Sequence, residues 1–293
     1  MDKDERIETI GCDLHVHSVY SDGLLDPREI VSMARSAGMR YLAVTDHDCY
    51  EGSLLAAKES DESLAVIPGV EVDVVEDVEI LVYGTPNDRL LEMTRTLVAE
   101  RSQVARRIVD AIRKATRNRS LDFDAGIAAS ARGSIMKPHM ARLCEANGLA
   151  EDFLDFKRKL MEHWMPEGVP THRKPGARDL VEWAREAGCK AILAHPLYYL
   201  LPRLGGKRYE SVQELLSMDV DGYEFYYDYG QQGEDNRDLR RRMDGVLKAR
   251  AEEESLFLTG GSDFHRPGDR FGETACPEEA CRRLFETLSA TSP

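Results

Sequence analysis

The sequence predicts an α/β fold in which strands and helices alternate around one helical insertion. Two observations carry this prediction: short apolar runs rich in Val, Ile and Leu alternate with amphipathic segments, and one long central segment has helical patterns only. Alternation of strand and helix is typical of a parallel sheet or barrel. We therefore expect a barrel built from residues 1–85 and 175–293, with residues 86–174 inserted as helices that cover its mouth.

The first half of the predicted barrel opens with a strand at residues 9–17. The next helix is expected to begin at Asp26, an N-cap followed by Pro27 at the first helical position and Glu29 at the capping-box position. Gly38 stands where this helix is expected to end. The elements that follow are, in chain order, a strand at 41–48, a helix at 51–60, and strands at 64–75 and 78–84.

The central segment has no convincing strand pattern, and the alternation of strand and helix resumes after it. Its helical patterns cover residues 90–117, 136–148 and 151–164. The second half of the barrel is expected to contain, in order, a helix at 179–188, a strand at 190–195, a helix at 209–218, a strand at 221–227, a helix at 236–254, a strand at 256–265 and a last helix from Pro277.

Ionisable side chains gather at the carboxyl ends of five predicted strands. They are His15, His17, Asp46, His47, Glu71, His195, Asp263 and His265. In an α/β barrel these strand ends form one mouth, where catalytic residues from several strands meet. Imidazole and carboxylate groups together suit Zn, Mn or Fe ions. So many ligands exceed the needs of one tetrahedral ion, which predicts two or three divalent ions that share bridging carboxylates.

Composition limits the partners that this chain is expected to bind. A net charge of −14 disfavours a broad nucleic-acid-binding surface, because such a surface needs clustered Lys and Arg, but it allows a small phosphorylated nucleotide held by metal ions. The acidic N-terminus does not resemble a signal peptide, and no apolar stretch approaches the roughly 20 residues that span a membrane. We therefore expect a cytoplasmic protein without a membrane partner, and the sequence does not set its oligomeric state.

Six cysteines are scattered along the chain without a C-x-x-C pair. Isolated cysteines in a chain that is not exported are typically reduced and partly buried. We therefore expect free thiols and no thiolate zinc site.

Six motifs in a fixed order resemble those of the PHP (polymerase and histidinol phosphatase) superfamily. They are "DLHVHSVYSDG", "AVTDHD", "PGVEV", "PHMAR", "LAHP" and "GSDFH". The last motif and the helical insertion resemble the nucleotide-phosphoesterase branch, which includes adenosine 3′,5′-bisphosphate phosphatases and a 5′-to-3′ exoribonuclease. This resemblance implies a distorted seven-stranded (β/α)7 barrel, similar to a TIM barrel, with a multinuclear metal site.

The resemblance also implies a set of metal ligands: His15, His17, Asp22, His47, Glu71, His139, His195, Asp263 and His265. His15, His17, Glu71 and Asp263 would surround one metal. Asp22, His47 and His195 would hold a second, and His265 would complete either group. Glu71 would bridge to a third metal that His139 reaches from the insertion. His195 and Asp263 are the expected catalytic residues, and the acid for the leaving group is open between His195 and a bound water.

Basic and acidic side chains around these ligands are expected to assist them. The candidates for binding the substrate phosphate are Arg142, Lys137, Arg173 and Arg266. Arg142 shares a helix face with His139, and a guanidinium matches phosphate geometry better than an ammonium does. An ordinary solvated side chain is the alternative for each. The acids expected to orient ligand histidines are Asp13, Asp46 and Glu224, with direct metal binding as the alternative for Asp46.

One position departs from the family pattern. Relatives in this branch carry a histidine in the strand after the glutamate, in a pattern E-x-H-x-x-G, where this chain has Leu81. Leucine cannot coordinate a metal, so the place of the histidine passes to Glu79, Asp77 or water. We therefore predict two firmly held metals and a weak or absent third.

Three functions are compatible with these features. The first is hydrolysis of a phosphomonoester of a small nucleotide, of the 3′,5′-nucleoside bisphosphate type, by in-line attack of metal-bound hydroxide. The second is a 5′-to-3′ exonuclease that acts on short oligoribonucleotides with the same metals. The third is a non-catalytic metal-binding module, for which Leu81 is the only support.

Overall fold

Seven strands form one sheet in which the strand order follows the chain. The computed structural model describes residues 11–201, 209–273 and 276–291. The strands are β1 (Cys12–Val16), β2 (Tyr41–Val44), β3 (Ala65–Asp73), β4 (Glu79–Tyr83), β5 (Lys190–Leu193), β6 (Gly222–Tyr226) and β7 (Phe257–Gly260). Each predicted strand is therefore confirmed, and residues 9 and 10 of the first predicted strand lie outside the described part.

The chain after β7 returns to β1 and nearly closes the barrel. The main-chain N–H of Asp263 donates to the carbonyl of His15, and the N–H of His17 donates to the carbonyl of Phe264. These hydrogen bonds complete a distorted seven-stranded barrel, which confirms the predicted fold class.

One strand runs against the direction expected from the alternation of strand and helix. β4 is antiparallel to β3 and β5, whereas the other neighbouring pairs are parallel. Only residues 74–78 connect β3 to β4, and a parallel crossover needs about a dozen residues or more. The chain therefore turns back as a hairpin. As a consequence, Glu79 at the start of β4 pairs with Asp73 at the end of β3.

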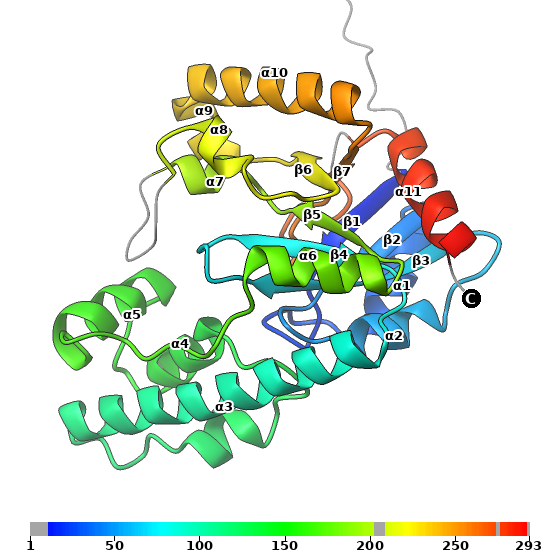
Figure 1. Cartoon of the computed structure of the whole chain (residues 1–293). Coiled ribbons are helices and arrows are strands. Elements are labelled where there is room, and N and C mark those ends of the chain that lie inside the picture. Colours follow the sequence, from blue (N-terminus) through cyan, green and yellow to red (C-terminus); the bar gives the residue numbers. More distant parts are fainter. Residues whose placement is uncertain (1–10, 202–208, 274–275, 292–293) are drawn as a thin grey trace, which may run out of the picture.

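Helices surround the barrel (Figure 1). They are α1 (Pro27–Ser36), α2 (Glu51–Ala57), α6 (Ala177–Glu186), α7 (Leu197–Leu200), α8 (Val212–Leu215), α9 (Gly230–Asp235), α10 (Arg237–Glu254) and α11 (Glu278–Thr291). α1 begins as expected, because Asp26 accepts the N–H of Arg28 while Glu29 accepts that of Asp26. No described helix is long and apolar enough to cross a membrane.

Side chains of β4 alternate between two apolar cores, as the period of two requires. In β4, Leu81 and Tyr83 pack inside the barrel, whereas Ile80 and Val82 pack on the side of the outer helices. This alternation fixes which side chains reach the interior and the mouth.

The segment between β4 and α6 is helical in its described residues, as expected. Its elements are α3 (Asp88–Thr116), η1 (Asp124–Ala128), α4 (Lys137–Ala146), α5 (Phe153–Lys159) and η2 (Leu160–Trp164), where η1 and η2 are π-helical. The segment has an apolar core of its own that includes Ile108, Met140 and Phe156. α3 runs along the barrel and continues past it (Figure 1), where it contacts α4 and η2.

Two of the six cysteines differ from the expectation of free thiols. Cys12 at the start of β1 and Cys281 in α11 form a disulfide, with their Cα atoms 6.8 Å apart. They are adjacent because α11 packs against β1, which the spacing of cysteines along the sequence does not reveal. The remaining cysteines are free and buried, as expected: Cys49, Cys144, Cys189 and Cys276.

Candidate metal centre

Eight ionisable side chains lie at the mouth of the barrel and form what we call the centre: His15, His17, Asp22, His47, Glu71, His195, Asp263 and His265. All are buried except Asp263 and His265, whose side chains are 23% and 28% exposed. Their positions follow from the fold, because most of them stand at or just after the carboxyl end of a strand. The structure thus brings together all but one of the predicted metal ligands.

His15 and His17 form the middle of the centre. Their Nε2 atoms face each other at 3.1 Å. Glu71 Oε2 lies 3.3 Å from the first of these nitrogens and 3.4 Å from the second. Asp263 Oδ1 lies 3.4 Å and 3.1 Å from the same two atoms. Two imidazole nitrogens and two carboxylate oxygens therefore converge on one point.

A second group lies on the far side of His17. Asp22 Oδ1 is 3.3 Å from His265 Nε2, and it is 3.9 Å from both His47 Nε2 and His17 Nδ1. The His17 ring also stacks on the His265 ring, with 4.2 Å between their centroids. In this arrangement His265, rather than His195, accompanies Asp22 and His47.

A third group includes the start of β4. Glu71 Oε1 lies 3.1 Å from His195 Nε2, and Glu71 Oε2 lies 3.2 Å from His47 Nδ1. Glu79 Oε2 lies 3.5 Å from His195 Nε2. Leu81 points to the same side of β4 but is buried in the barrel core. Glu79 therefore reaches the centre from the strand in which the family resemblance led us to expect a histidine.

The donor atoms of the centre fit divalent metal ions. His47 Nδ1 is buried and has no hydrogen-bond partner, although a Glu71 oxygen lies nearby. A buried polar atom without a hydrogen bond lowers stability, and a cation between the two atoms removes that penalty. Imidazole nitrogens and carboxylate oxygens are the ligands that Zn, Mn and Fe accept. The residues present therefore suit a multinuclear site.

Charges within the centre oppose the effect of burial on the histidines. Burial alone would lower the pKa of His15, but the surrounding carboxylates, chiefly Glu224, raise it well above its ordinary value. Burial also disfavours the charged forms of His195 and His265, yet carboxylate partners raise their pKa values to about 9 and about 10. His17 is different, since burial and the neighbouring His265 lower its pKa to about 4. In the metal-free protein, protons therefore occupy part of the centre.

Glu224, which the sequence predicts to orient a ligand histidine, contacts His15. Its Oε1 lies 3.0 Å from His15 Nδ1, and its Oε2 accepts the main-chain N–H of His195 at 2.8 Å. A carboxylate partner fixes the proton on Nδ1, which leaves the lone pair of His15 Nε2 directed at the centre. This is the arrangement that supports a metal-binding histidine.

Asp46 and Asp13 are held by protein hydrogen bonds. Both oxygens of Asp46 accept bonds from Ser18 or Ser21, and Ser21 Oγ lies 3.3 Å from His17 Nδ1. Asp13 accepts the N–H of Ser262 and so ties β1 to the segment that carries Asp263. Burial raises the pKa of each aspartate to about 6. Both therefore position the centre, which favours the orienting role of Asp46 over direct metal binding.

Three of the four cations predicted to bind phosphate lie on α4 or beside the centre. Lys137 and Arg142 belong to α4. Partial burial lowers the pKa of Arg142. The charge of Asp22 opposes this shift, and the charge of Arg266 adds to it. Arg266 directly follows His265 and is exposed.

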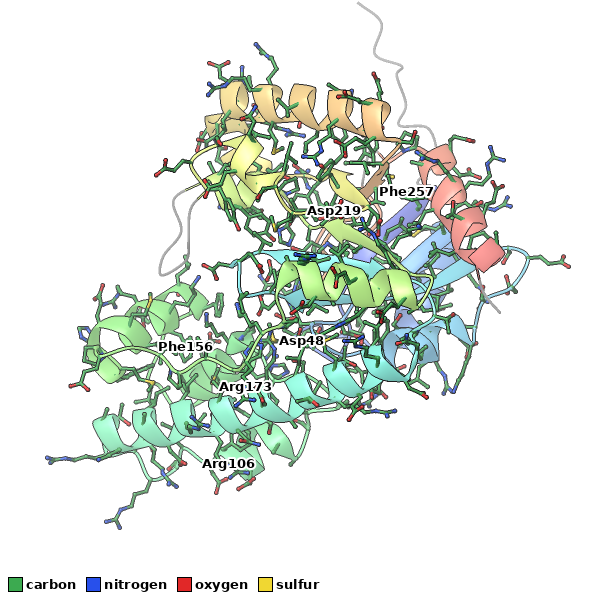
Figure 2. The ribbon with its side chains drawn as sticks, viewed as in Figure 1. Asp48, Arg106, Phe156, Arg173, Asp219 and Phe257 are labelled. Carbon is green, nitrogen blue, oxygen red and sulfur yellow. A yellow bond between two sulfur atoms is a disulfide. The ribbon has the colours of Figure 1, made fainter. Side chains whose placement is uncertain are left out.

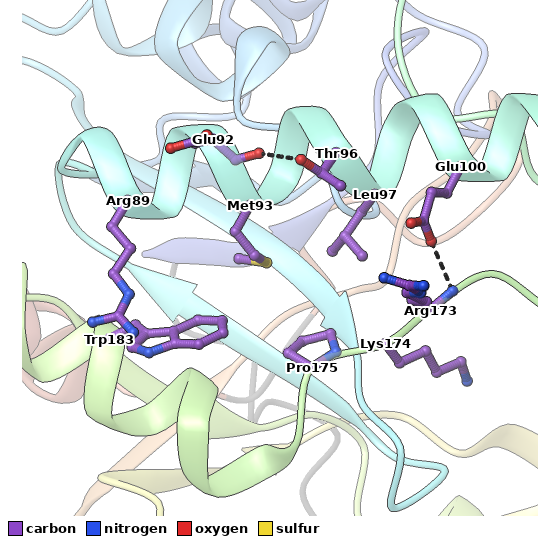
Figure 3. A pocket seen from close by; sticks show the side chains of 10 residues that line it. All are labelled: Arg89, Glu92, Met93, Thr96, Leu97, Glu100, Arg173, Lys174, Pro175 and Trp183. Atoms are coloured by element: carbon purple, nitrogen blue, oxygen red, sulfur yellow. Dashed lines mark hydrogen bonds between the residues drawn. The ribbon is translucent and has the colours of Figure 1, made fainter.

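Arg173 lies in a different place. It lines an open groove of about 370 Å³ between α3 and α6, together with Trp183 and Met93 (Figure 3). Its main-chain N–H donates to Glu100 at 2.9 Å. The structure therefore does not place Arg173 among the side chains of the centre.

His139 is held in a geometry that the sequence did not predict. The main-chain N–H of Met136 donates to His139 Nδ1 at 3.1 Å. Because Nδ1 is then the accepting nitrogen, the proton of the neutral ring lies on Nε2. Burial and the charge of Arg142 lower the pKa of His139, which favours this neutral form. The ring is thus arranged as a hydrogen-bond donor rather than as a metal ligand.

Sequence reasoning missed the ion pairs behind the centre. Arg101 of α3 binds Asp48, labelled in Figure 2, and also binds Asp73 at the end of β3. Only the "TDHD" motif pointed to Asp48, and nothing distinguishes Arg101 from the other basic residues of its helix. Tyr227, just after β6, donates to Asp263 Oδ2 at 2.9 Å. Its place next to a predicted strand end was the only available signal.

A seven-stranded barrel with imidazoles and carboxylates gathered at its mouth defines the class of metal-dependent hydrolases. The family model of the PHP domain matches residues 13–293. The chain belongs to the PHP family, and it is a metal-dependent phosphoesterase of that family.

Two bacterial relatives cover most of this chain. A 3′,5′-nucleoside bisphosphate phosphatase from Chromobacterium violaceum is 30% identical, over 95% of this chain and 96% of the relative. A 5′-3′ exoribonuclease from Haemophilus influenzae is 32% identical, over 87% of this chain and 90% of the relative. The first relative thus matches the chain along almost its whole length.

Two solved structures share the fold. A structure from Bifidobacterium adolescentis, described as a metal-dependent phosphoesterase, superposes with a TM-score of 0.77 at 24% identity, over 97% of this chain and 98% of the other. An amidohydrolase from Chromobacterium violaceum, solved with bound sulfate and without metal, gives a TM-score of 0.71 at 26% identity over 96% of both chains. The barrel and its insertion therefore occur together in these proteins.

Proposed function

We propose that this enzyme is a phosphatase that hydrolyses a phosphomonoester of a small nucleotide of the 3′,5′-nucleoside bisphosphate type. The observation that carries the proposal is the convergence of four imidazoles on one buried carboxylate, Glu71, at the mouth of the barrel. The substrate class follows the relative that matches 95% of this chain. Bound sulfate in a related structure supports a site for a tetrahedral anion.

The proposed metal ligands are the eight side chains of the centre, with Glu71 as the shared bridge. Divalent ions, of Mn, Zn or Fe, supply Lewis acidity at phosphate oxygens and lower the pKa of water that attacks phosphorus. Two ions are proposed to bind firmly, one beside His15 and Asp263 and one beside Asp22 and His265. Glu79 marks the place of a weaker third ion.

Other residues are proposed to bind the reacting phosphate and to act on it. Arg142 and the Nε2–H of His139 share one face of α4 and serve as donors to phosphate oxygens. Asp263 and His195 remain the proposed catalytic residues. Asp263 is accessible to substrate, and His195 Nδ1 lies 3.1 Å from Tyr199 Oη, which gives it a partner for proton exchange.

The helical insertion, residues 86–174, is proposed to form a cover over the mouth. Its main chain contacts the loop after β1, where the N–H of Ser134 donates to the carbonyl of Tyr20 at 2.8 Å. Arg132 binds Asp26 at the start of α1, and Arg101 reaches Asp48 beside the centre. These contacts support the proposed position of the insertion over the mouth.

The test is release of inorganic phosphate from adenosine 3′,5′-bisphosphate by Mn²⁺-loaded enzyme, with the nucleotide product identified. We expect 5′-AMP. Asp263→Asn, whose folding is verified by circular dichroism, is expected to lose the activity. No phosphate release by the loaded wild type, or equal activity of Asp263→Asn, contradicts the proposal.

A second candidate is a 5′-to-3′ exoribonuclease that acts on short RNA. The relatives of this name from Haemophilus influenzae and Escherichia coli, 32% and 28% identical, favour it. The net charge of −14 counts against a long RNA-binding surface. Cleavage of a 5′-phosphorylated pentaribonucleotide at least as fast as the bisphosphate would support this candidate.

A further inference from the structure

A cavity of about 400 Å³ lies within the insertion, and Asp73 of β3 is the barrel residue among those that line it. One wall is apolar and is formed by side chains of the insertion, among them Ile108, Met140, Met161, Met165 and Val169. Met161, Met165 and Val169 are only half-buried, so part of this apolar surface is open to the cavity. The volume falls within the range of about 300–1,000 Å³ that small-molecule sites occupy.

Positively charged side chains also line the cavity: Lys137, Lys157 and Lys174. Within the described residues, Lys137 and Lys157 have no carboxylate within 4.0 Å, although Lys157 Nζ lies 5.5 Å from the centroid of the Phe153 ring. Lys174 lies 3.7 Å from Asp73 and 3.9 Å from Asp77. Arg101 also lines the cavity, but its guanidinium already forms ion pairs with Asp48 and Asp73. The lysines thus exceed the carboxylates available to them.

The cavity shares its walls with the segments that carry the centre. Asp73, which lines it, stands two residues after Glu71 on β3, a separation of about 7 Å along a strand. Arg101, which also lines it, forms an ion pair with Asp48, the residue that follows His47. The cavity therefore adjoins the segments on which the centre is built.

We propose that this cavity holds the part of the nucleotide that does not react: the base lies against the methionine-rich wall, and the second phosphate lies among the lysines. The inference rests on the proposed function. It assigns to this cavity the distinction between a bisphosphate and a monophosphate. A phosphate dianion complements the unmatched lysines, and a thioether-lined wall adapts to a flat ring. A cavity of this size accommodates one nucleoside, which sets the substrate apart from a chain of nucleotides.

The first test compares adenosine 3′,5′-bisphosphate with adenosine 3′-monophosphate, which lacks the second phosphate. The wild type is expected to favour the bisphosphate in kcat/KM. In Lys157→Ala, KM for the bisphosphate is expected to rise about tenfold, so that the preference largely disappears. Lys114→Ala, which removes an exposed lysine on α3 outside the cavity lining, is the matched control and is expected to keep the preference.

A preference that survives in Lys157→Ala, or that falls equally in Lys114→Ala, overturns the inference. Direct binding separates this inference from the proposed function. Adenosine 3′,5′-bisphosphate is titrated calorimetrically into the full chain in the presence of a chelator, without turnover. Binding that Lys157→Glu abolishes and Lys114→Ala retains supports the cavity even if no nucleotide is hydrolysed. Absence of binding to the wild type, or equal binding to Lys157→Glu, rejects it.

Discussion

Glu71 shows at the scale of one residue why the centre needs cations. Its carboxylate is 1% exposed and lies within 3.4 Å of nitrogens from His15, His17, His47 and His195. Burial opposes its charge, but His15 and His47 hold its pKa well below the ordinary value. A carboxylate that stays ionised among imidazoles is suited to the bridging role that we propose for Glu71.

Replacement of Glu71 by Gln keeps the shape of the side chain and removes its charge. We expect Glu71→Gln to lose at least one ion per chain and to reduce kcat/KM by on the order of 100-fold or more, because the shared ligand is gone. Elemental analysis and steady-state kinetics measure both. Full metal content in a folded Glu71→Gln would contradict the bridging role.

Glu224 acts on the metal through the orientation of His15. Glu224→Gln is expected to weaken metal affinity by about 10- to 100-fold, because a neutral amide no longer fixes the proton on His15 Nδ1. Metal-buffered titration gives the affinity. Glu252→Gln, an exposed change on α10, is the control; if both variants bind metal as the wild type does, the orienting role is rejected.

The raised pKa values of His195 and His265 predict that metal and protons compete. At pH 7.5 the metal-free ring of His195, with a pKa of about 9, and that of His265, with a pKa of about 10, are both mostly protonated. Ligand histidines must be neutral, so metal binding is expected to release protons, about two in total from these rings. Calorimetry in buffers of different ionisation enthalpy counts them. Heats that do not depend on the buffer would contradict this.

At the scale of the element, the direction and register of β4 determine which of its side chains can reach the centre. The sequence predicts a strand here and shows that Leu81 departs from the family pattern. It does not reveal that the strand is antiparallel. The hairpin brings Glu79 to the mouth and leaves Leu81 one layer deeper in the core. Hydrophobic alternation specifies which residues share a face, whereas strand direction depends on how residues 74–78 turn.

The same element provides a test of the metal count. We expect two firmly held ions in the wild type and a third, firmly held ion in Leu81→His, because residue 81 pairs directly with Glu71 across β3 and β4 and an imidazole there lies next to the shared carboxylate. Leu81→Asn is the control for loss of the apolar side chain. Three tightly bound ions in the wild type, or an unchanged count in Leu81→His, would contradict this account.

At the scale of the whole molecule, strand–helix alternation predicted a parallel sheet or barrel, and the polar ends of strands predicted most of the centre. The seven-stranded barrel and the place of Asp22 followed from the family resemblance. His15, His17 and Asp263 could be predicted because their motifs lie at strand ends. Arg101 could not, since it lies 53 residues from Asp48 along the chain and meets it only once α3 packs beside the barrel. The Cys12–Cys281 disulfide was missed for the same reason. Contacts between distant segments carry no local pattern.

The most direct test of the central claim is a side-by-side comparison of kcat/KM for adenosine 3′,5′-bisphosphate and a 5′-phosphorylated pentaribonucleotide, with one preparation of Mn²⁺-loaded enzyme. The account predicts that the bisphosphate is the better substrate by at least about tenfold and yields 5′-AMP. An equal or higher value for the oligonucleotide would contradict it.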